Sequence, residues 1–181
     1  MKIMKAVRTA SVWHVHQRRK GAAGEPYVNH LIEVADLVAA AGASEDVICA
    51  ALLHDAIEDQ GVTASKIADL FGPDVAALVW EVTDDKTLPK AERKALQIAH
   101  APGLSLGAKL VKLADKISNV RSIASSPPAD WPLERRMAYV EFCCNVVAGL
   151  RGINAALEET FDSEAKTARL AQSAEGLRAA S

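Results

Sequence analysis

Aromatic residues and cysteines are scarce in this sequence. Phe, Trp and Tyr together make up 4% of its 181 residues, although 50% of the residues are hydrophobic. Alanine and leucine recur throughout and are strong helix formers, so the composition favours packed helices over β-rich structure. The three cysteines, Cys49, Cys143 and Cys144, are odd in number and have apolar neighbours. They form no disulfide framework, which is typical of a reducing compartment.

Long apolar runs and an excess of one charge are also missing. No run reaches the roughly 18 apolar residues that a membrane span requires, and residues 1–20 have no apolar core of signal-peptide length. The formal net charge of −2 gives no general attraction to nucleic acid or to a membrane surface. We therefore expect a soluble cytoplasmic protein that binds neither, and any basic site must be local.

The length fits a single domain, which would bury about 70% of the surface that the unfolded chain exposes. Neither an interdomain linker nor an internal repeat interrupts it. We expect this domain to cover residues 1–161. Residues 162–181 turn to alanine and charge, and we expect them to form a tail that is at most a loosely attached helix.

Hydrophobic periodicity predicts an all-α fold, a bundle of about seven or eight helices. Ser44 is suited to cap a helix that opens with two acidic residues, and Pro73 and Pro89 are suited to the first turn of a helix. The expected helices cover residues 3–17, 27–41, 44–59, 63–71, 73–83, 89–99, 106–123 and 132–159.

Four titratable side chains interrupt the apolar helix expected over residues 44–59. They are His54, Asp55, Glu58 and Asp59. At helical spacing the three acids fall at i, i+3 and i+4, so they share one face. Unpaired, three like charges would repel one another, and a cation is their natural partner. The alternative is a helix end at the surface with a solvated acidic tip.

Similar residues recur on two other predicted helices, at His30 and Asp115. Each alone is weak evidence, because a helical histidine is usually a hydrogen-bonded structural residue and Asp115 could pair with Lys116 or Arg121. Together with His54 and Asp55 they offer two imidazoles and two carboxylates from three helices. That set suits Zn, Mn or Fe in a helical bundle, with positions left open for water.

The order of these residues resembles the H…HD…D signature of the HD-domain metal-dependent phosphohydrolases. Several longer segments resemble the hydrolase domain of the Rel/Spo alarmone enzymes, namely Arg18–Lys20, Pro26–His30, Ala51–Asp59, Phe71–Pro73 and Lys112–Arg121. The segment Glu81–Lys90 resembles the stand-alone small alarmone hydrolases within that family. The resemblance covers about Val12 to Glu159. This group lacks a synthetase domain, so its members are expected to degrade (p)ppGpp and not to make it.

The resemblance also implies a role for each site residue. It implies one Mn²⁺ per chain, held by His30, His54, Asp55 and Asp115. Glu58 and Asp59 would be the acid/base pair that orients and deprotonates the attacking water, and Asn119 would position the water or the ribose. Metal binding can lower the pKa of water from about 15.7 toward 7, which makes it a competent nucleophile at neutral pH.

The two diphosphates of the substrate require positive charge. By the same resemblance, Arg19 and Lys20 would contact the nucleotide, and Arg135 and Tyr139 would approach the pyrophosphate. Lys86, Lys90 and Lys112 are further candidates for binding phosphate. The plain alternatives are cations solvated on loops and helix ends, and a tyrosine that only packs. Two positions depart from the usual pattern. Leu31 follows His30 where proline is common, and Ala56 and Ile57 replace the more frequent threonine and valine. Neither departure removes a ligand.

The resulting hypothesis is a Mn²⁺-dependent (p)ppGpp 3′-pyrophosphohydrolase that yields GDP or GTP and pyrophosphate, with a small nucleotide as its partner. One alternative is a metal-dependent phosphatase acting on another nucleotide such as NADPH. A second alternative is a non-catalytic module that binds the alarmone. The acid pair Glu58 and Asp59 argues against the second, because a pure binder has no need of it.

Overall fold

The computed structural model describes residues 1–179 of the chain. The described residues form α-helices and one short 3-10 helix with no strand, so the all-α expectation is confirmed. None of these helices is long and apolar enough to cross a membrane. The α-helices are α1 Lys2–Trp13, α2 Val28–Ala40, α3 Glu45–Leu53, α4 Ala56–Gln60, α5 Ala64–Phe71, α6 Pro73–Val82, α7 Lys90–His100, α8 Leu106–Ser125, α9 Leu133–Ala148 and α10 Ala155–Ala179, and the 3-10 helix is η1 Ala101–Gly103.

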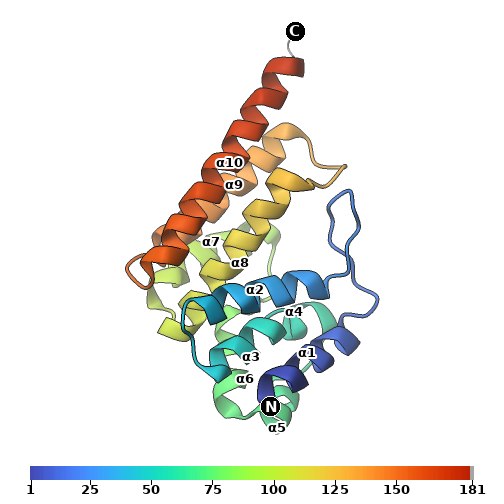
Figure 1. Cartoon of the computed structure of the whole chain (residues 1–181), viewed down its shortest axis with the longest axis vertical. Helices are drawn as coiled ribbons and strands as arrows, with labels where there is room; N and C mark the ends of the chain where they lie inside the picture. Colours follow the sequence, from blue (N-terminus) through green and yellow to red (C-terminus); the bar gives the residue numbers. More distant parts are fainter. Residues whose placement is uncertain (180–181) are drawn as a thin grey trace.

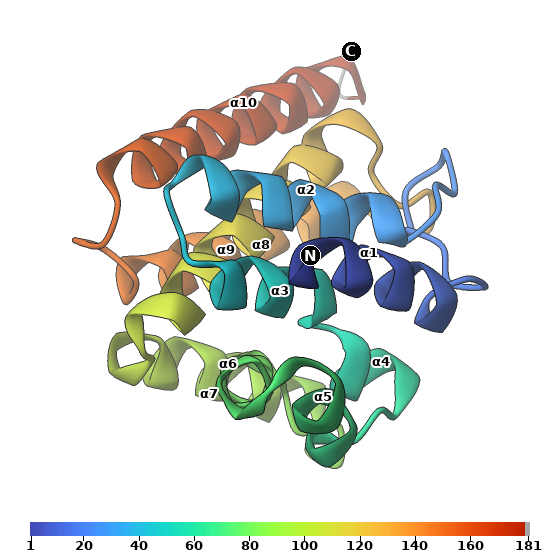
Figure 2. The same cartoon turned by 60° about the horizontal axis from the view of Figure 1, so that its bottom comes forward.

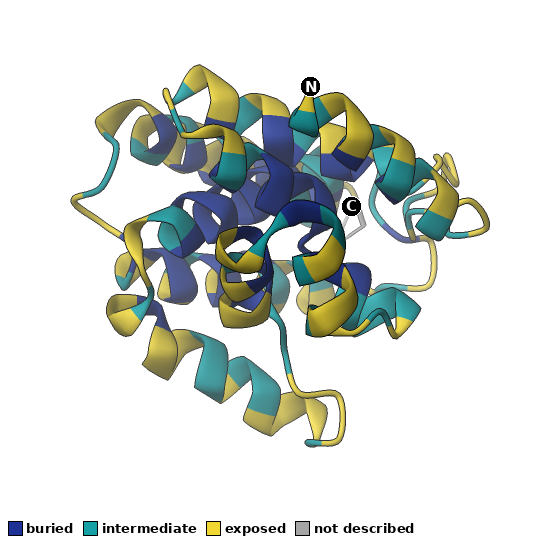
Figure 3. Cartoon of the chain, turned by 90° about the horizontal axis from the view of Figure 1, so that it is seen from below, coloured by how far each residue is buried: buried dark blue, intermediate teal, exposed yellow. Residues whose placement is uncertain are grey.

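Helix α8 lies at the centre of the bundle, where α2, α3, α6, α9 and α10 all pack against it (Figure 1). Turning the molecule shows α10 on one outer side and α5, α6 and α7 on the opposite side (Figure 2). The buried residues gather in the middle (Figure 3). Leu53, Leu113, Ile117 and Phe161 are among the largest fully buried side chains. The central helix α8 therefore holds the core and also carries Asp115.

Several predicted helix boundaries are confirmed by their capping contacts. The hydroxyls of Ser44 and Thr63 accept hydrogen bonds from the backbone N–H groups three residues later, at the starts of α3 and α5. Pro73 opens α6, directly after Gly72, whose φ of +93° favours glycine. These local signals act within a few residues, which is why the sequence reveals them.

The single helix expected over residues 44–59 is wrong, because it is divided at His54 and Asp55. Helix α3 ends at Leu53 and α4 begins at Ala56, with Asp55 as its N-cap residue at φ −96° and ψ 1°. The Asp55 carboxylate accepts a hydrogen bond from the Tyr27 hydroxyl at 2.6 Å, which holds the turn. The Asp55 carbonyl still accepts from the Asp59 N–H at 2.8 Å. The three acids therefore remain close together in spite of the break.

The single helix expected over residues 132–159 is also wrong. Helix α9 ends at Ala148 and α10 begins at Ala155, and Gly152 between them has a φ of +84°. The Glu158 carboxylate accepts hydrogen bonds from the N–H groups of residues 152–154, and the Asn154 side chain caps α10 by accepting the Leu157 N–H at 3.0 Å. The boundary expected at residue 161 falls inside α10. This helix packs along α8 and buries Ala165 and Ala168.

Candidate metal centre and adjoining cleft

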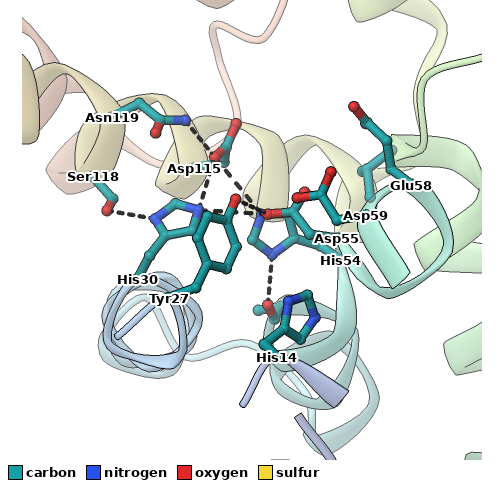
Figure 4. A network of polar contacts seen from close by, with 12 residues as sticks. His14, Tyr27, His30, His54, Asp55, Glu58, Asp59, Asp115, Ser118 and Asn119 are labelled. Carbon is teal, nitrogen blue, oxygen red and sulfur yellow. Dashed lines mark hydrogen bonds and ion pairs between the residues drawn. The ribbon is translucent and has the colours of Figure 1, made fainter. Parts of the chain in front are cut away.

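The side chains of His30, His54 and Asp115 converge on one point (Figure 4). Their ligand atoms all lie within 4.8 Å of one another. The His30 Nε2 atom is 3.3 Å from the Asp115 carboxylate, and the His54 Nε2 atom is 3.1 Å from the Asp55 carboxylate. Helix α2 supplies His30, the turn between α3 and α4 supplies His54 and Asp55, and α8 supplies Asp115. The structure thus brings the four predicted ligands together.

Hydrogen bonds on the far side of each imidazole fix its tautomer. His54 donates from Nδ1 to the carbonyl of Ala51 at 2.8 Å, and His30 donates from Nδ1 to the Ser118 hydroxyl at 2.8 Å. In the neutral form, both imidazoles therefore turn the Nε2 lone pair toward the centre. The buried Nε2 of His54 has no hydrogen-bond partner. A lone pair facing carboxylate oxygens at this distance requires a cation or a proton between them, so the residues present fit a divalent metal.

The electrostatics of the centre point the same way. Burial alone would lower the pKa of His54, but the charges of Asp55 and Asp115 outweigh it and raise this pKa to about 10. Burial lowers the pKa of His30. Burial favours protonation of Asp115, but Lys116 and the two histidines outweigh it and hold this pKa well below its ordinary value. The centre therefore attracts positive charge, and its carboxylates are ionised and ready to coordinate it.

Each ligand carboxylate has a fixed outer partner. Asp55 accepts the Tyr27 hydroxyl, whereas Asp115 accepts Asn119 Nδ2 at 2.6 Å and Lys116 Nζ at 3.0 Å. The Asn119 side chain also accepts a hydrogen bond from Arg19 at 3.1 Å. These contacts orient the carboxylates before any ligand arrives, which is the usual arrangement around a metal in a protein.

Glu58 and Asp59 extend from α4 beside this centre, but their surroundings differ (Figure 4). Asp59 is held firmly, because it accepts Gln17 Nε2 at 2.7 Å and Lys86 Nζ at 2.5 Å. Glu58 has weaker contacts: its carboxylate accepts the Asp84 backbone N–H at 3.4 Å and lies 3.8 Å from Arg93 and 3.9 Å from Lys86. Burial and the nearby acids raise the pKa of Glu58. Of the two, Glu58 is held less tightly and is the carboxylate better suited to take up a proton.

The centre forms the floor of a cleft of about 490 Å³. The loop between α1 and α2, helices α4, α7, α8 and α9, and the loop before α9 contribute to its walls. The cleft is rich in cations. Its basic side chains are Arg18, Arg19, Lys20, Lys90, Lys94, Lys112, Lys116 and Arg135. The cleft can therefore bind an anion of nucleotide size, with basic side chains on several walls and the cluster of histidines and aspartates at its floor.

The predicted substrate residues occupy different places in this cleft. Arg19, Lys20 and Lys90 line it directly, as do Arg135 and Tyr139. The Arg135 guanidinium lies 4.2 Å from the Trp131 ring centroid.

The other two predicted lysines differ from this group. Lys112 also lines the cleft, but it is buried and donates to the Val82 carbonyl at 2.9 Å. Lys86 does not line the cleft, and its amine binds Asp59 instead.

Sequence reasoning missed Lys94, Trp131 and Gln17, which all line the cleft. Lys94 lies over the Phe142 ring, 4.4 Å from its centroid. The signal for Lys94 was present, because it follows Lys90 by one helical turn and shares its face. Trp131 lies in a loop and Gln17 follows the end of α1, so no periodic pattern marks either residue.

The HD domain family matches residues 6–152. The chain belongs to the HD-domain family. Within this family it is 47% identical over 159 residues to the guanosine-3′,5′-bis(diphosphate) 3′-pyrophosphohydrolase MESH1 of Danio rerio, covering 87% of this chain and 88% of that protein. It is 46% identical over 161 residues to the protein of the same name from Homo sapiens, covering 88% of this chain and 90% of that one. The resemblance seen in the motifs is thus confirmed over nearly the full length.

The fold of this HD domain also matches a solved structure. That structure is described as a metazoan ortholog of SpoT that hydrolyzes ppGpp and plays a role in starvation responses. The TM-score is 0.87 at 45% sequence identity, and the match covers 90% of this chain and 93% of that one. The chain therefore shares the fold of that structure over most of its length.

Proposed function

We propose that this HD-domain protein is a guanosine-3′,5′-bis(diphosphate) 3′-pyrophosphohydrolase. It hydrolyses ppGpp to GDP and pyrophosphate, and pppGpp to GTP and pyrophosphate. The observation that carries the proposal is the centre of two imidazoles and two carboxylates at the floor of a cationic cleft. Relatives that share almost half of the sequence bear the name of this activity.

We assign the metal ligands to His30, His54, Asp55 and Asp115, and the metal to Mn²⁺, one per chain. Nitrogen and carboxylate donors suit Mn²⁺, Zn²⁺ and Fe²⁺ alike, and the choice of Mn²⁺ follows the family resemblance. When bound, the cation supplies a Lewis acid and lowers the pKa of water toward neutrality. The buried Nε2 of His54, which lies 3.1 Å from the Asp55 carboxylate and 3.7 Å from the Asp115 carboxylate, supports its place in the ligand set.

The remaining residues move a proton and orient the reactants. Glu58 accepts a proton from the attacking water, because its raised pKa and loose contacts suit a general base. Asp59, tied to Gln17 and Lys86, holds the water in line. Asn119 is positioned by Arg19 and Asp115 to bind the ribose or the water.

The reaction is then a substitution at phosphorus. The water oxygen forms a bond to the phosphorus atom that carries the ribose 3′ oxygen. The bond between that phosphorus and the 3′ oxygen breaks. The 3′ oxygen takes a proton and remains with the nucleotide, while both phosphorus atoms leave as pyrophosphate. Arg19, Lys20, Lys90 and Arg135 offset the charge of the phosphates during this step.

Hydrolysis in water enriched in ¹⁸O tests this assignment directly. Attack at phosphorus places one ¹⁸O atom in pyrophosphate and none in GDP, as mass spectrometry of the separated products would show. Release of orthophosphate alone, or ¹⁸O in the nucleotide, would contradict the proposed bond cleavage. Adding NADPH to the same assay ranks it against ppGpp, and preferential loss of the NADPH phosphate would favour the second candidate substrate. Tight binding of ppGpp without turnover would instead favour a non-catalytic module.

The proposed compartment is the cytoplasm. Cys49, Cys143 and Cys144 are all free, and two of them are buried. Unpaired cysteines of this kind are typical of a reducing environment. The proposed partner is the small nucleotide alone, since the balanced net charge offers nothing to nucleic acid or a membrane.

A further inference from the structure

A series of hydrogen bonds and ion pairs extends from the Nδ1 atom of His30, on the side of the ring away from the centre, and the proposed chemistry does not use it. The His30 Nδ1 atom is 2.8 Å from the Ser118 hydroxyl, and that hydroxyl is 2.6 Å from a carboxylate oxygen of Glu33. The second oxygen of Glu33 binds Arg121, which also binds Glu164 on α10 at 2.9 Å. This series of contacts therefore connects α2, α8 and the C-terminal helix α10.

The chemistry of these groups fixes the direction of each hydrogen bond. A carboxylate beside a guanidinium can only accept, so the single proton of the Ser118 hydroxyl points to Glu33. The hydroxyl oxygen is then free to accept from Nδ1–H of His30. The imidazole keeps its proton on Nδ1 and turns the bare Nε2 toward the centre. The side chain of His30 is only 1% exposed, so water does not compete for this role.

From these contacts we infer that Ser118 and Glu33 are positioning residues that hold His30 in its metal-binding tautomer. Arg121 and Glu164 secure Glu33 from α10, so the last helix supports the metal site although it contributes no residue to the cleft. This inference rests on the proposed metal role of His30. Partners of this kind typically change metal affinity by about 10- to 100-fold when they are removed.

The Glu33→Gln variant gives the sharpest test. Arg121 is only a donor, so the new amide must present its oxygen to Arg121 and its NH₂ group to Ser118. The Ser118 hydroxyl then turns its proton to His30 Nδ1, and the imidazole proton moves to Nε2. We expect ¹⁵N–¹H histidine spectra of the metal-free protein to show this exchange of tautomer. We also expect calorimetry to show that Mn²⁺ binds about 10-fold or more weakly.

Two further variants complete the test. Ser118→Ala removes the acceptor and should mix the two tautomers. Glu164→Gln should weaken Mn²⁺ binding by a smaller factor. Glu175→Gln is the control: it loses the ion pair between α10 and Arg136, which is not part of this series of contacts, and should leave Mn²⁺ affinity unchanged. Glu33 is partly exposed, so its variant tests the inference even where Ser118→Ala fails to fold.

The possible failures are separable. Wild-type protein that binds no Mn²⁺ would overturn the proposed metal centre itself. Wild-type binding with an unchanged His30 tautomer and unchanged Mn²⁺ affinity in Glu33→Gln would overturn the positioning role alone. Equal losses in Glu164→Gln and Glu175→Gln would overturn the link to α10, because they would reflect a general loosening of that helix.

Discussion

Single residues give the metal centre its chemistry, and Asp55 has the most roles among them. Its carboxylate lies 3.1 Å from His54 Nε2, accepts the Tyr27 hydroxyl, and marks the turn between α3 and α4. Removing it leaves His54 facing Asp115 without its nearest carboxylate. The fixed geometry of the centre therefore depends strongly on this one side chain.

The Asp55→Ala variant should lose hydrolysis by more than about 100-fold, beyond the range typical of outer partners of a metal. The matched control is Asp85→Ala, an exposed acid whose carboxylate accepts the hydroxyl and backbone N–H of Thr87. Steady-state rates at saturating Mn²⁺ measure both. Full manganese-dependent activity in Asp55→Ala would show that the ligand assignment is wrong.

Glu58 should be separable from the ligands by kinetics. Glu58→Gln is expected to lower kcat by about 100- to 10,000-fold, the usual contribution of a general base, while Mn²⁺ affinity stays the same. Burial raises the pKa of Glu58, and a base works only when it is deprotonated. The wild-type rate should therefore fall with decreasing pH through a pKa above the ordinary glutamate value, and this limb should vanish in the variant. Unchanged kcat in Glu58→Gln, with Glu92→Gln as control, would assign the base elsewhere.

At the scale of helices, α7 has an unusual position. None of its residues is buried, yet it supplies Lys90 and Lys94 to the cleft. Lys94 lies against Phe142 and Tyr139 of α9, so cation–π contacts help attach the helix. A helix held this way can present charge to a substrate without belonging to the core.

Lys94→Ala should therefore affect binding more than chemistry. We expect KM for ppGpp to rise about 10-fold, equal to about 1.4 kcal/mol, with little change in kcat. Lys66→Ala, an exposed lysine on α5, serves as the control. A fall in kcat at constant KM would instead place Lys94 in the chemical step.

Gly152 makes the break between α9 and α10 possible, because its φ of +84° suits only glycine well. Gly152→Ala should lower the free energy of unfolding by about 1 kcal/mol, and thermal unfolding should occur about 2–4 °C lower. Gly103→Ala is the control, since that glycine has an ordinary backbone and open space around it. Equal stability of the two variants would mean that the turn tolerates a side chain.

The two broken helices also show how far the sequence predicts this fold. Ser44, Thr63 and Pro73 act on their own helix ends, so those boundaries could be predicted. The break at Asp55 depends on Tyr27, a residue distant in sequence, while the apolar pattern from Ala50 to Ile57 continues across it. Hydrophobic periodicity predicts which face of a helix is buried, but it does not predict a hydrogen bond such as that between Tyr27 and Asp55.

At the scale of the whole molecule, the site exists only where distant helices meet. The centre joins α2, α8 and the turn after α3, and the cleft adds residues from α7 and α9. The motif residues His30, His54 and Asp115 could be recognised from the sequence because chemistry restricts them to a few residue types. Lys94 could also have been found, one helical turn after Lys90. The place of Trp131 in the cleft and the contacts that link Ser118, Glu33, Arg121 and Glu164 depend on how the helices pack, which the sequence does not state.

The measurement that tests the proposed function most directly is turnover of ppGpp by purified protein treated with EDTA, with and without added Mn²⁺. Chromatography would follow GDP and pyrophosphate. We predict that stripped protein leaves ppGpp intact and that Mn²⁺ restores equal amounts of both products. Intact ppGpp in the presence of Mn²⁺, or equal turnover with and without the metal, would contradict a manganese-dependent hydrolase.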